Sequence, residues 1–271
     1  MKAFIVDLDR CNGCYNCQLA CKDEHCGNDW RPYAAEQPQT GQFWCKVDQR
    51  ERGRVPVVGV AYTPMFCGMC DSAECMAAAK DGAVYRREDG IVIIDPEKAI
   101  GQKQIAEACP HSRVYWNEAL QLPQKCTGCA HLLDDGWNVP RCVDACFTGA
   151  LRFGDEEDFA DEIAQAEPAD GFEGSGAHVY YLHKPKRWIA GTVADRSINE
   201  VVIGAEVVVT DDKGTEVKTL TTDEFGDFRY DFFDKKKYHV VINANGYKTV
   251  ELDADCTDKD VVFDDVLVER A

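Results

Sequence analysis

The amino-acid sequence predicts an α+β chain in two parts, a cysteine-rich first part and an all-β second part. Of the 15 cysteines, all but Cys256 fall in the first 146 residues, most of them in groups with short, regular spacings. From Trp188 onward, short stretches of alternating polar and apolar residues are separated by turn-forming residues. With 271 residues, the chain is long enough for two domains that each have a core.

The first cysteine group, from Cys11 to Cys21, has the spacing C-x2-C-x2-C-x3-C. In two-cluster ferredoxins, three thiolates of such a group hold one cubane iron–sulfur cluster, and the fourth ligates the other cluster. A complementary group of four lies between Cys126 and Cys146. Cross-ligation therefore predicts two ligand sets. These are Cys11, Cys14, Cys17 and Cys146 for cluster 1, and Cys21, Cys126, Cys129 and Cys142 for cluster 2.

A third group, Cys67-x2-Cys70-x4-Cys75, lies between the other two. It has no fourth member of its own, because the position four residues after Cys75 is Ala79. Cys109 supplies the fourth ligand of cluster 3. The twelve cysteines then divide into three sets of four. The other thiols, Cys26, Cys45 and Cys256, lie outside any ligand spacing and are interpreted as ordinary cysteines.

Other uses of cysteine fit this sequence less well. Structural zinc sites use well-separated pairs of cysteines, whereas the first group crowds four sulfurs into eleven residues. Disulfide scaffolds are typical of small secreted chains. The C-x-x-C-H motif of covalently attached haem is absent. A zinc-stapled interaction protein is therefore the weakest of three candidate function classes, behind an electron-transfer subunit and a stand-alone electron carrier.

The chain is acidic, with 48 acidic against 30 basic side chains and a formal charge of −18. This charge repels phosphate backbones, so we expect no nucleic-acid partner. No stretch of 18 apolar residues is present, which predicts no direct membrane insertion. The first residues show no signal-peptide pattern. A cytoplasmic location is therefore expected, with export alongside a signal-bearing partner as the alternative.

Short elements are expected between the cysteine loops. They are strands at residues 3–8 and 114–117, helices at 19–24, 96–109 and 130–135, and a hairpin over 82–94 that turns at Asp89-Gly90. Asp95 and Pro96 suit the start of the second helix. Residues 27–60 are expected to form a turn-rich insertion. Its arginines Arg50, Arg52 and Arg54 suit either solvated charge or contact with an acidic partner or a cluster edge.

The second part predicts a small β-sandwich, because about seven short strands alternate with turn signals. The expected strands are residues 189–193, 205–210, 218–222, 225–230, 239–243, 249–253 and 261–268. No catalytic constellation occurs among them. The expected domains are a two-cluster ferredoxin-like domain (1–60 with 115–150), an inserted one-cluster ferredoxin-like domain (61–114), a linker (151–187) and the all-β sandwich (188–271).

The cysteine pattern resembles the iron–sulfur subunits of the dimethyl sulfoxide reductase-like molybdopterin oxidoreductases. In that family four cysteine groups hold four clusters, whereas here Ala79 and the lone Cys109 delete one of them. Within the family the chain is most similar to the small subunits of transhydroxylases that act on pyrogallol and phloroglucinol. The stretches that carry this similarity are 50–53, 82–85, 87–92, 94–99, 114–118, 124–127 and 129–135. The last eighty or so residues resemble carboxypeptidase regulatory-like, Ig-like modules.

The resemblance implies an electron-transfer subunit with three [4Fe–4S] clusters. Its partner would be a large catalytic subunit, in a heterodimer or a higher assembly, that carries molybdopterin guanine dinucleotide with Mo or W. The active site is expected in that partner, which would act on a polyhydroxylated aromatic as a transhydroxylase or a dehydroxylase. A stand-alone ferredoxin-like carrier is the alternative. The histidines that could donate to cluster sulfurs are expected at the surface instead, namely His25, His111, His131 and His178.

Overall fold

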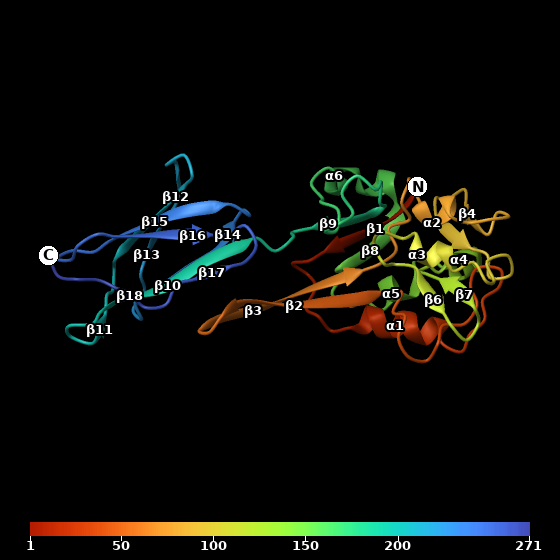
Figure 1. The fold of residues 1–271 in the computed structure, drawn as a ribbon, viewed down its shortest axis with the longest axis horizontal. Helices are drawn as coiled ribbons and strands as arrows, with labels where there is room; N and C mark the ends of the chain where they lie inside the picture. The colour runs from red at the N-terminus through yellow and green to blue at the C-terminus, as the bar shows by residue number, and fades with distance from the viewer. The chain divides into compact units, whose positions relative to one another are not determined.

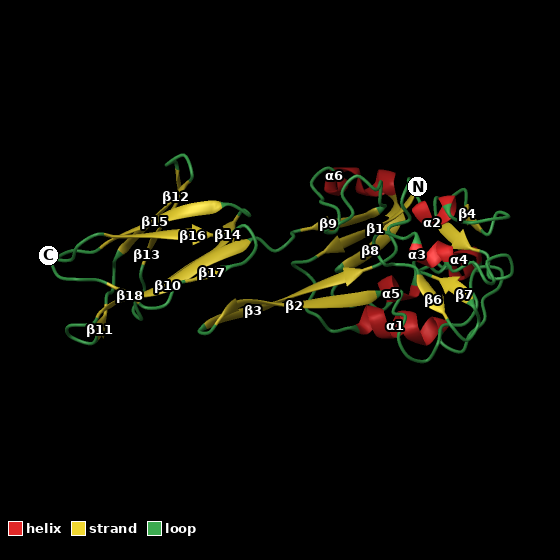
Figure 2. Cartoon of the chain, viewed as in Figure 1, coloured by secondary structure: helices red, strands yellow, loops and turns green.

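The computed structural model describes residues 1–271 and divides into two compact units. The first unit comprises residues 1–49 and 62–184, and the second comprises residues 50–61 and 185–271. Figure 2 shows that helices occur in the first unit, whereas the second is built from strands and loops. No helix has the length and apolar character needed to cross a membrane. The cytoplasmic location stays a prediction.

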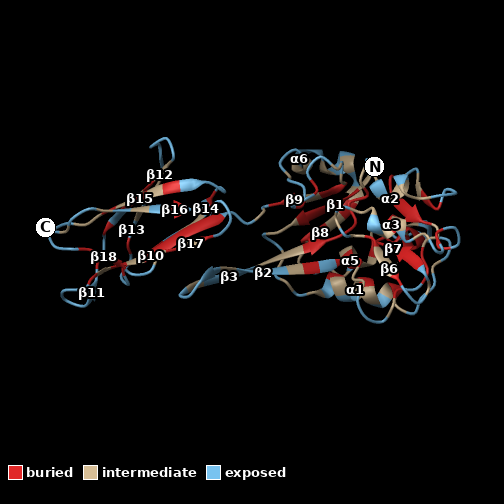
Figure 3. Ribbon diagram, in the orientation of Figure 1, coloured by how far each residue is buried: buried red, intermediate tan, exposed pale blue.

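The first unit contains a three-stranded sheet with the order β8 (Leu151–Asp155), β1 (Lys2–Asp7) and β9 (Val179–Leu182) (Figure 1). Its central strand β1 pairs antiparallel with β8 and parallel with β9. The side chain of Phe4 stacks on Phe66, with ring centroids 4.8 Å apart. The inner residues of β1 are almost fully buried, as its red colour in Figure 3 shows.

The stretch 151–187, expected as a linker, instead completes this sheet. Besides β8 and β9 it contains a 3₁₀ helix η1 (Glu156–Phe159) and α6 (Ala160–Ile163). Leu151 and Phe153 are buried against β1, so that this stretch is part of the core as far as residue 184.

Short helices and two-stranded ribbons carry the cysteine loops. The elements are α1 (Asn16–His25), α2 (Glu74–Ala77), β4 (Val84–Arg86), β5 (Val92–Ile94), α3 (Gln104–Glu107), β6 (Tyr115–Asn117), β7 (Leu122–Gln124), α4 (Ala130–Asp134) and α5 (Arg141–Asp144). The helix expected over 96–109 is reduced to α3. Asp95 does accept the backbone N–H groups of Glu97 and Lys98, but Gly101 adopts a φ of +75° that ends the turn.

The stretch expected as a turn-rich insertion ends in a hairpin of β2 (Lys46–Arg54) and β3 (Val57–Met65). The hairpin starts in the first unit, and its tip, residues 50–61, belongs to the second. Strand β2 was not predicted because most of its residues are charged or polar and face solvent.

The second unit is the predicted β-sandwich. One sheet has β10 (Arg187–Asp195) at its centre, paired with β11 (Glu200–Val201), β14 (Asp227–Phe233), β17 (Val261–Val262) and β18 (Val266–Leu267). The other sheet has the order β13 (Glu216–Thr221), β12 (Glu206–Asp211), β15 (Lys237–Asn243) and β16 (Val250–Asp255). Alternate residues of these strands, such as Val207, Val209 and Val240, form a common core.

Candidate iron–sulfur centres

The first predicted ligand set lines one pocket. Cys11, Cys14, Cys17 and Cys146 surround about 310 Å³ of space between protein atoms. Gly13 lets the first loop close over this space with a φ of +70°, where a Cβ would lie 2.5 Å from the ring of Tyr62. The backbone N–H of Leu151 donates to the Sγ of Cys146 at 3.4 Å.

The third predicted set lines a second pocket. Cys67, Cys70, Cys75 and Cys109 surround about 380 Å³, together with apolar residues such as Val92 and Val114. The backbone N–H of Arg113 donates to the Sγ of Cys109 at 3.4 Å. Burial raises the pKa of the Cys75 thiol to about 11. Ala79 packs against the surrounding core but supplies no ligand atom.

The second predicted set, Cys21, Cys126, Cys129 and Cys142, is the most deeply buried. Helices α1 and α5 supply Cys21 and Cys142, and these two helices pack against each other. Burial raises the pKa of the Cys126 thiol to about 12, and that of Cys21 well above its usual range. Repulsion from the neighbouring thiols of the set raises both further.

These raised pKa values test whether the sites suit a cationic metal cluster. Gathered, buried thiols resist ionisation unless a positive group sits among them, and the thiolate is the form that ligates metal. All 15 cysteines are free of disulfides, so none of the twelve is used otherwise. The donor sets are sulfur throughout, which suits iron–sulfur ligation. The residues therefore fit the cofactor that their spacing predicts.

His25 contradicts the surface position expected for it. Its side chain is 1 % exposed, and its Nε2 lies 3.7 Å from the Sγ of Cys129. Burial, helped by the nearby His131, lowers the pKa of His25 to about 3, so the ring is neutral. In the tautomer with its proton on Nε2, the ring would direct that proton at the Sγ of Cys129; Nδ1 has no hydrogen-bond partner. No local sequence pattern marks this histidine as different from the others.

The other three histidines make no hydrogen bond to a cysteine sulfur, although His111 lines the pocket of the third set. His131 is buried, stacks on Trp30 and pairs with Glu24 at 3.1 Å. His178 is also buried, and its ring nitrogens lie 2.6 Å from Glu156 and 3.0 Å from Asp71. His111, half-buried, stacks on Phe172. The surface expectation is therefore wrong for His131 and His178 as well.

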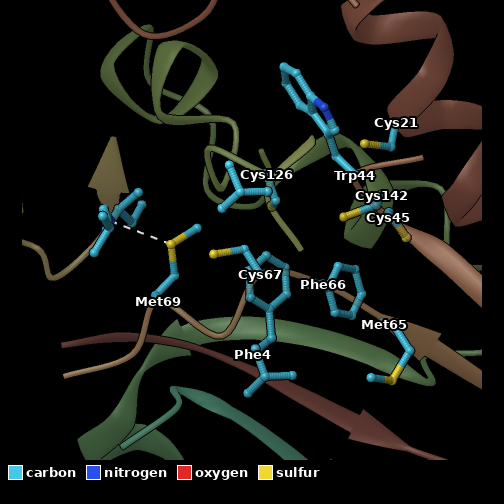
Figure 4. Packing of buried hydrophobic residues seen from close by; sticks show 14 of the residues in the cluster. Phe4, Cys21, Trp44, Cys45, Met65, Phe66, Cys67, Met69, Cys126 and Cys142 are labelled. Atoms are coloured by element: carbon cyan, nitrogen blue, oxygen red, sulfur yellow. Dashed lines mark hydrogen bonds between the residues drawn. The ribbon is translucent and has the colours of Figure 1, made fainter. Parts of the chain in front are cut away.

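Cys45, interpreted from spacing as an ordinary thiol, lies between two ligand sets. It is 1 % exposed and makes hydrogen-bond contacts with Cys17 of the first set and Cys142 of the second. Cys45 and Cys142 lie close together in Figure 4. The contact with Cys45 lowers the pKa of the Cys17 thiol. The position was missed because Cys45 stands alone in the sequence.

Lys125 is a second group that sequence reasoning overlooked. It directly precedes Cys126, and its side chain is 2 % exposed. Its ammonium donates to the backbone carbonyls of Val92 and, at 3.0 Å, of Cys126. It also lies 3.6 Å from the Sδ of Met69, which accepts the N–H of Val92, drawn as the dashed line in Figure 4.

The arginines of the β2–β3 tip make contacts within the second unit. The expected solvated charge is found for Arg50 and Arg54 but not for Arg52. Arg52 forms two hydrogen bonds with Asp260, at 2.9 and 2.6 Å, and the two side chains are 10 % and 2 % exposed. Arg54 pairs with the exposed Asp264 at 2.9 Å. Arg50 is exposed and reaches only the carbonyl of Asp258, at 3.5 Å.

Comparison with known proteins places this architecture in a family. Residues 58–156 match the 4Fe–4S dicluster domain, and residues 188–264 match the carboxypeptidase regulatory-like domain. The pyrogallol hydroxytransferase small subunit of Pelobacter acidigallici is 39 % identical over 255 residues, which cover 89 % of this chain and 90 % of the relative. The chain belongs to the iron–sulfur subunits of the dimethyl sulfoxide reductase-like molybdopterin oxidoreductases.

Two further members of this family show how far the similarity extends. A tetrathionate reductase subunit of Salmonella typhimurium is 32 % identical over 194 residues, covering 66 % of this chain and 71 % of the relative. A sulfite dehydrogenase subunit of Allochromatium vinosum is 32 % identical over 176 residues, covering 60 % of this chain and 72 % of the relative. The chain is thus an iron–sulfur electron-transfer subunit that holds [4Fe–4S] clusters and serves a catalytic partner. The predicted fold class is confirmed by the two matched domains.

Proposed function

We propose that this subunit holds three [4Fe–4S] clusters and carries electrons for a large partner that contains molybdopterin guanine dinucleotide with Mo or W. The observation that carries the proposal is the gathering of twelve cysteines into three groups of four. The ligand sets are Cys11, Cys14, Cys17 and Cys146 for cluster 1, Cys21, Cys126, Cys129 and Cys142 for cluster 2, and Cys67, Cys70, Cys75 and Cys109 for cluster 3.

The three sets follow one another in space, which supports a linear path for electrons. Cys45 contacts the first and second sets. Cys67 of the third set lies close enough to Cys126 of the second for its charge to raise the pKa of that thiol, after the larger effect of burial. By its family position, cluster 1 is proposed to lie nearest the catalytic partner. We also propose that residues 61–114 form a one-cluster domain inserted between the two halves, 1–60 and 115–150, of a two-cluster domain.

When bound, the clusters would supply one-electron transfer. The protein's own contribution is to exclude water and to direct donors at the sulfurs. Backbone N–H groups point at Sγ atoms in each set, from Leu151 to Cys146, from Gly128 to Cys126 at 3.4 Å, and from Arg113 to Cys109. Such hydrogen bonds and burial are what tune cluster potentials.

The proposed substrate of the complex is a polyhydroxylated aromatic. Its support is the relative named as a pyrogallol hydroxytransferase small subunit, which matches over both the cysteine-rich part and the β-sandwich. Transfer of a hydroxyl between aromatics is redox-neutral overall, whereas reductive removal of a hydroxyl consumes two electrons. The two reactions differ in whether turnover needs a stoichiometric donor.

The test is to purify the native complex without oxygen and to measure its metals and its chains. We expect about twelve irons in the small subunit, a large second chain, and molybdenum or tungsten. Turnover of pyrogallol-type substrates is then compared with and without a reductant, which separates transhydroxylation from dehydroxylation. Iron at this level without a second chain and without molybdenum or tungsten would instead indicate a stand-alone carrier.

A further inference from the structure

Lys125 is a buried cation at the junction of two cysteine sets. It belongs to the loop of the second set, next to Cys126, while its ammonium reaches Met69 in the loop of the third set, between Cys67 and Cys70. The third contact, to the carbonyl of Val92, ties it to strand β5. The three acceptors of the ammonium thus come from the loop of the second set, the loop of the third set and strand β5.

The side-chain nitrogen of Lys125 contacts hydrogen-bond acceptors only. Two backbone carbonyl oxygens and a thioether sulfur accept from it, and each can act only as an acceptor toward an ammonium. No carboxylate pairs with Lys125 among the ion pairs of the structure. The groups near it that can become negative are the cysteine thiols of the two sets. Burial raises the pKa values of Cys126 and Cys75, and in both cases the charge of Lys125 acts in the opposite direction.

We propose that the buried positive charge of Lys125 raises the reduction potentials of clusters 2 and 3 together and leaves the potential of cluster 1 unaffected. This inference rests on the proposed function. A reduced cluster carries one more negative charge than an oxidised one, so a fixed cation beside it stabilises the reduced form. Because water is excluded there, the effect is screened less than at the surface. Lys125 would thereby make clusters 2 and 3 better electron acceptors.

A purely structural role for Lys125 makes a different prediction. If the side chain only joins the two loops, its loss admits water or loosens the ligands. Water stabilises the more highly charged, reduced cluster, so entry of water raises the potential. Loss of a buried positive charge lowers it. The sign of the shift therefore distinguishes the two roles.

The experiment uses the intact complex, purified without oxygen, with Lys125→Met, Lys125→Gln and Lys125→Arg variants. Redox titration followed by electron paramagnetic resonance gives the potential of each cluster at one fixed pH. Signals are assigned with Cys14→Ser and Cys109→Ala. The exposed Lys80, which carries no side-chain ion pair, provides the matched control Lys80→Met.

We expect Lys125→Met to make reduction of clusters 2 and 3 at least tenfold less favourable, which is about 59 mV for one electron. Cluster 1 and the Lys80→Met control should keep their wild-type potentials, and Lys125→Arg should restore most of the loss. Unchanged or raised potentials in fully loaded Lys125→Met would overturn the inference. So would an equal shift of all three clusters.

Loss of iron from Lys125→Met does not leave the question open. Lys125→Gln, which keeps an N–H donor toward Val92, is then titrated in its place. If neither neutral variant holds clusters 2 and 3, the role of Lys125 is structural and the inference fails. Wild-type complex without three clusters would refute the proposed function itself, before any variant is compared.

Discussion

The pair of Arg52 and Asp260 is predicted to anchor the β2–β3 tip within the second unit. The side chains are 10 % and 2 % exposed, and two charge-assisted hydrogen bonds join them. Asp260 also accepts the backbone N–H of Trp188 at 3.2 Å, and the guanidinium of Arg52 lies over the ring of Trp188. Removal of Arg52 therefore leaves a carboxylate buried without its cation.

The magnitude follows from this burial. Breaking a buried ion pair by removal of one partner costs about 3–5 kcal/mol, whereas an exposed pair contributes about 0.2–1 kcal/mol. Arg52→Met should fall in the first class. Arg54→Met is a matched control on the same hairpin, because the Arg54–Asp264 pair has a similar distance but is 53 % and 86 % exposed. That variant should cost less than about 1 kcal/mol.

Hydrogen exchange of the full complex, read by mass spectrometry, measures these costs locally. Peptides over β10 and β17 should exchange about a hundredfold to several thousandfold faster in Arg52→Met than in wild type, since a cost of about 3–5 kcal/mol is converted at tenfold for each 1.4 kcal/mol. The double variant Arg52→Met with Asp260→Asn should cost less than the sum of the single variants. Equal exchange in Arg52→Met and Arg54→Met would refute the claim that burial makes the first pair an anchor.

Three further predictions concern the first unit. Gly13→Ala should lose cluster 1, and with it about four irons, because the added Cβ collides with the ring of Tyr62. Gly27→Ala is the control, since Gly27 has a similar φ of +71° but open space around it, and this variant should keep its iron. Iron analysis of the two variants tests the prediction. Cys109→Ala should remove the resonance signal of cluster 3 alone, and loss of all signals would contradict the assignment. A hydrogen bond to Asp7 raises the pKa of His183, so this stabilisation is complete below about pH 6.5 and fades as pH rises through the raised pKa. The unfolding midpoints of wild type and His183→Gln should therefore differ most in mildly acidic buffer, and a pH-independent difference would count against this account.

The features that sequence reasoning predicted are those that local patterns encode. Cysteine spacing is set by the reach of one loop around one cluster, and strand alternation is set by the two faces of a sheet. The pairing of β8 and β9 with β1 escaped prediction because these strands lie about 150 and about 175 residues after β1 and carry no local signal. The hairpin β2–β3 escaped because its first strand is largely charged.

The cysteine sets are a prediction from sequence spacing, whereas the groups that surround them could not be predicted. Lys125 and His25 are types of residue that usually face solvent, and only tertiary packing buries them beside sulfur. Cys45 has no neighbour in sequence from which a ligand spacing could start. These contacts depend on how separate loops meet, which a linear pattern does not specify.

The position of β1 at the centre of its sheet has a consequence for how the protein is made. Its neighbours β8 and β9 are synthesised about 150 and about 175 residues later, and the first and second cysteine sets also await Cys142 and Cys146. The third set, by contrast, is complete once Cys109 has been made. A growing chain can thus gather its middle cysteines first, while Cys11 to Cys21 wait for Cys142 and Cys146 near the middle of the sequence. Any machinery that delivers iron and sulfide therefore meets the third site first, and the other two only once Cys146 has been made.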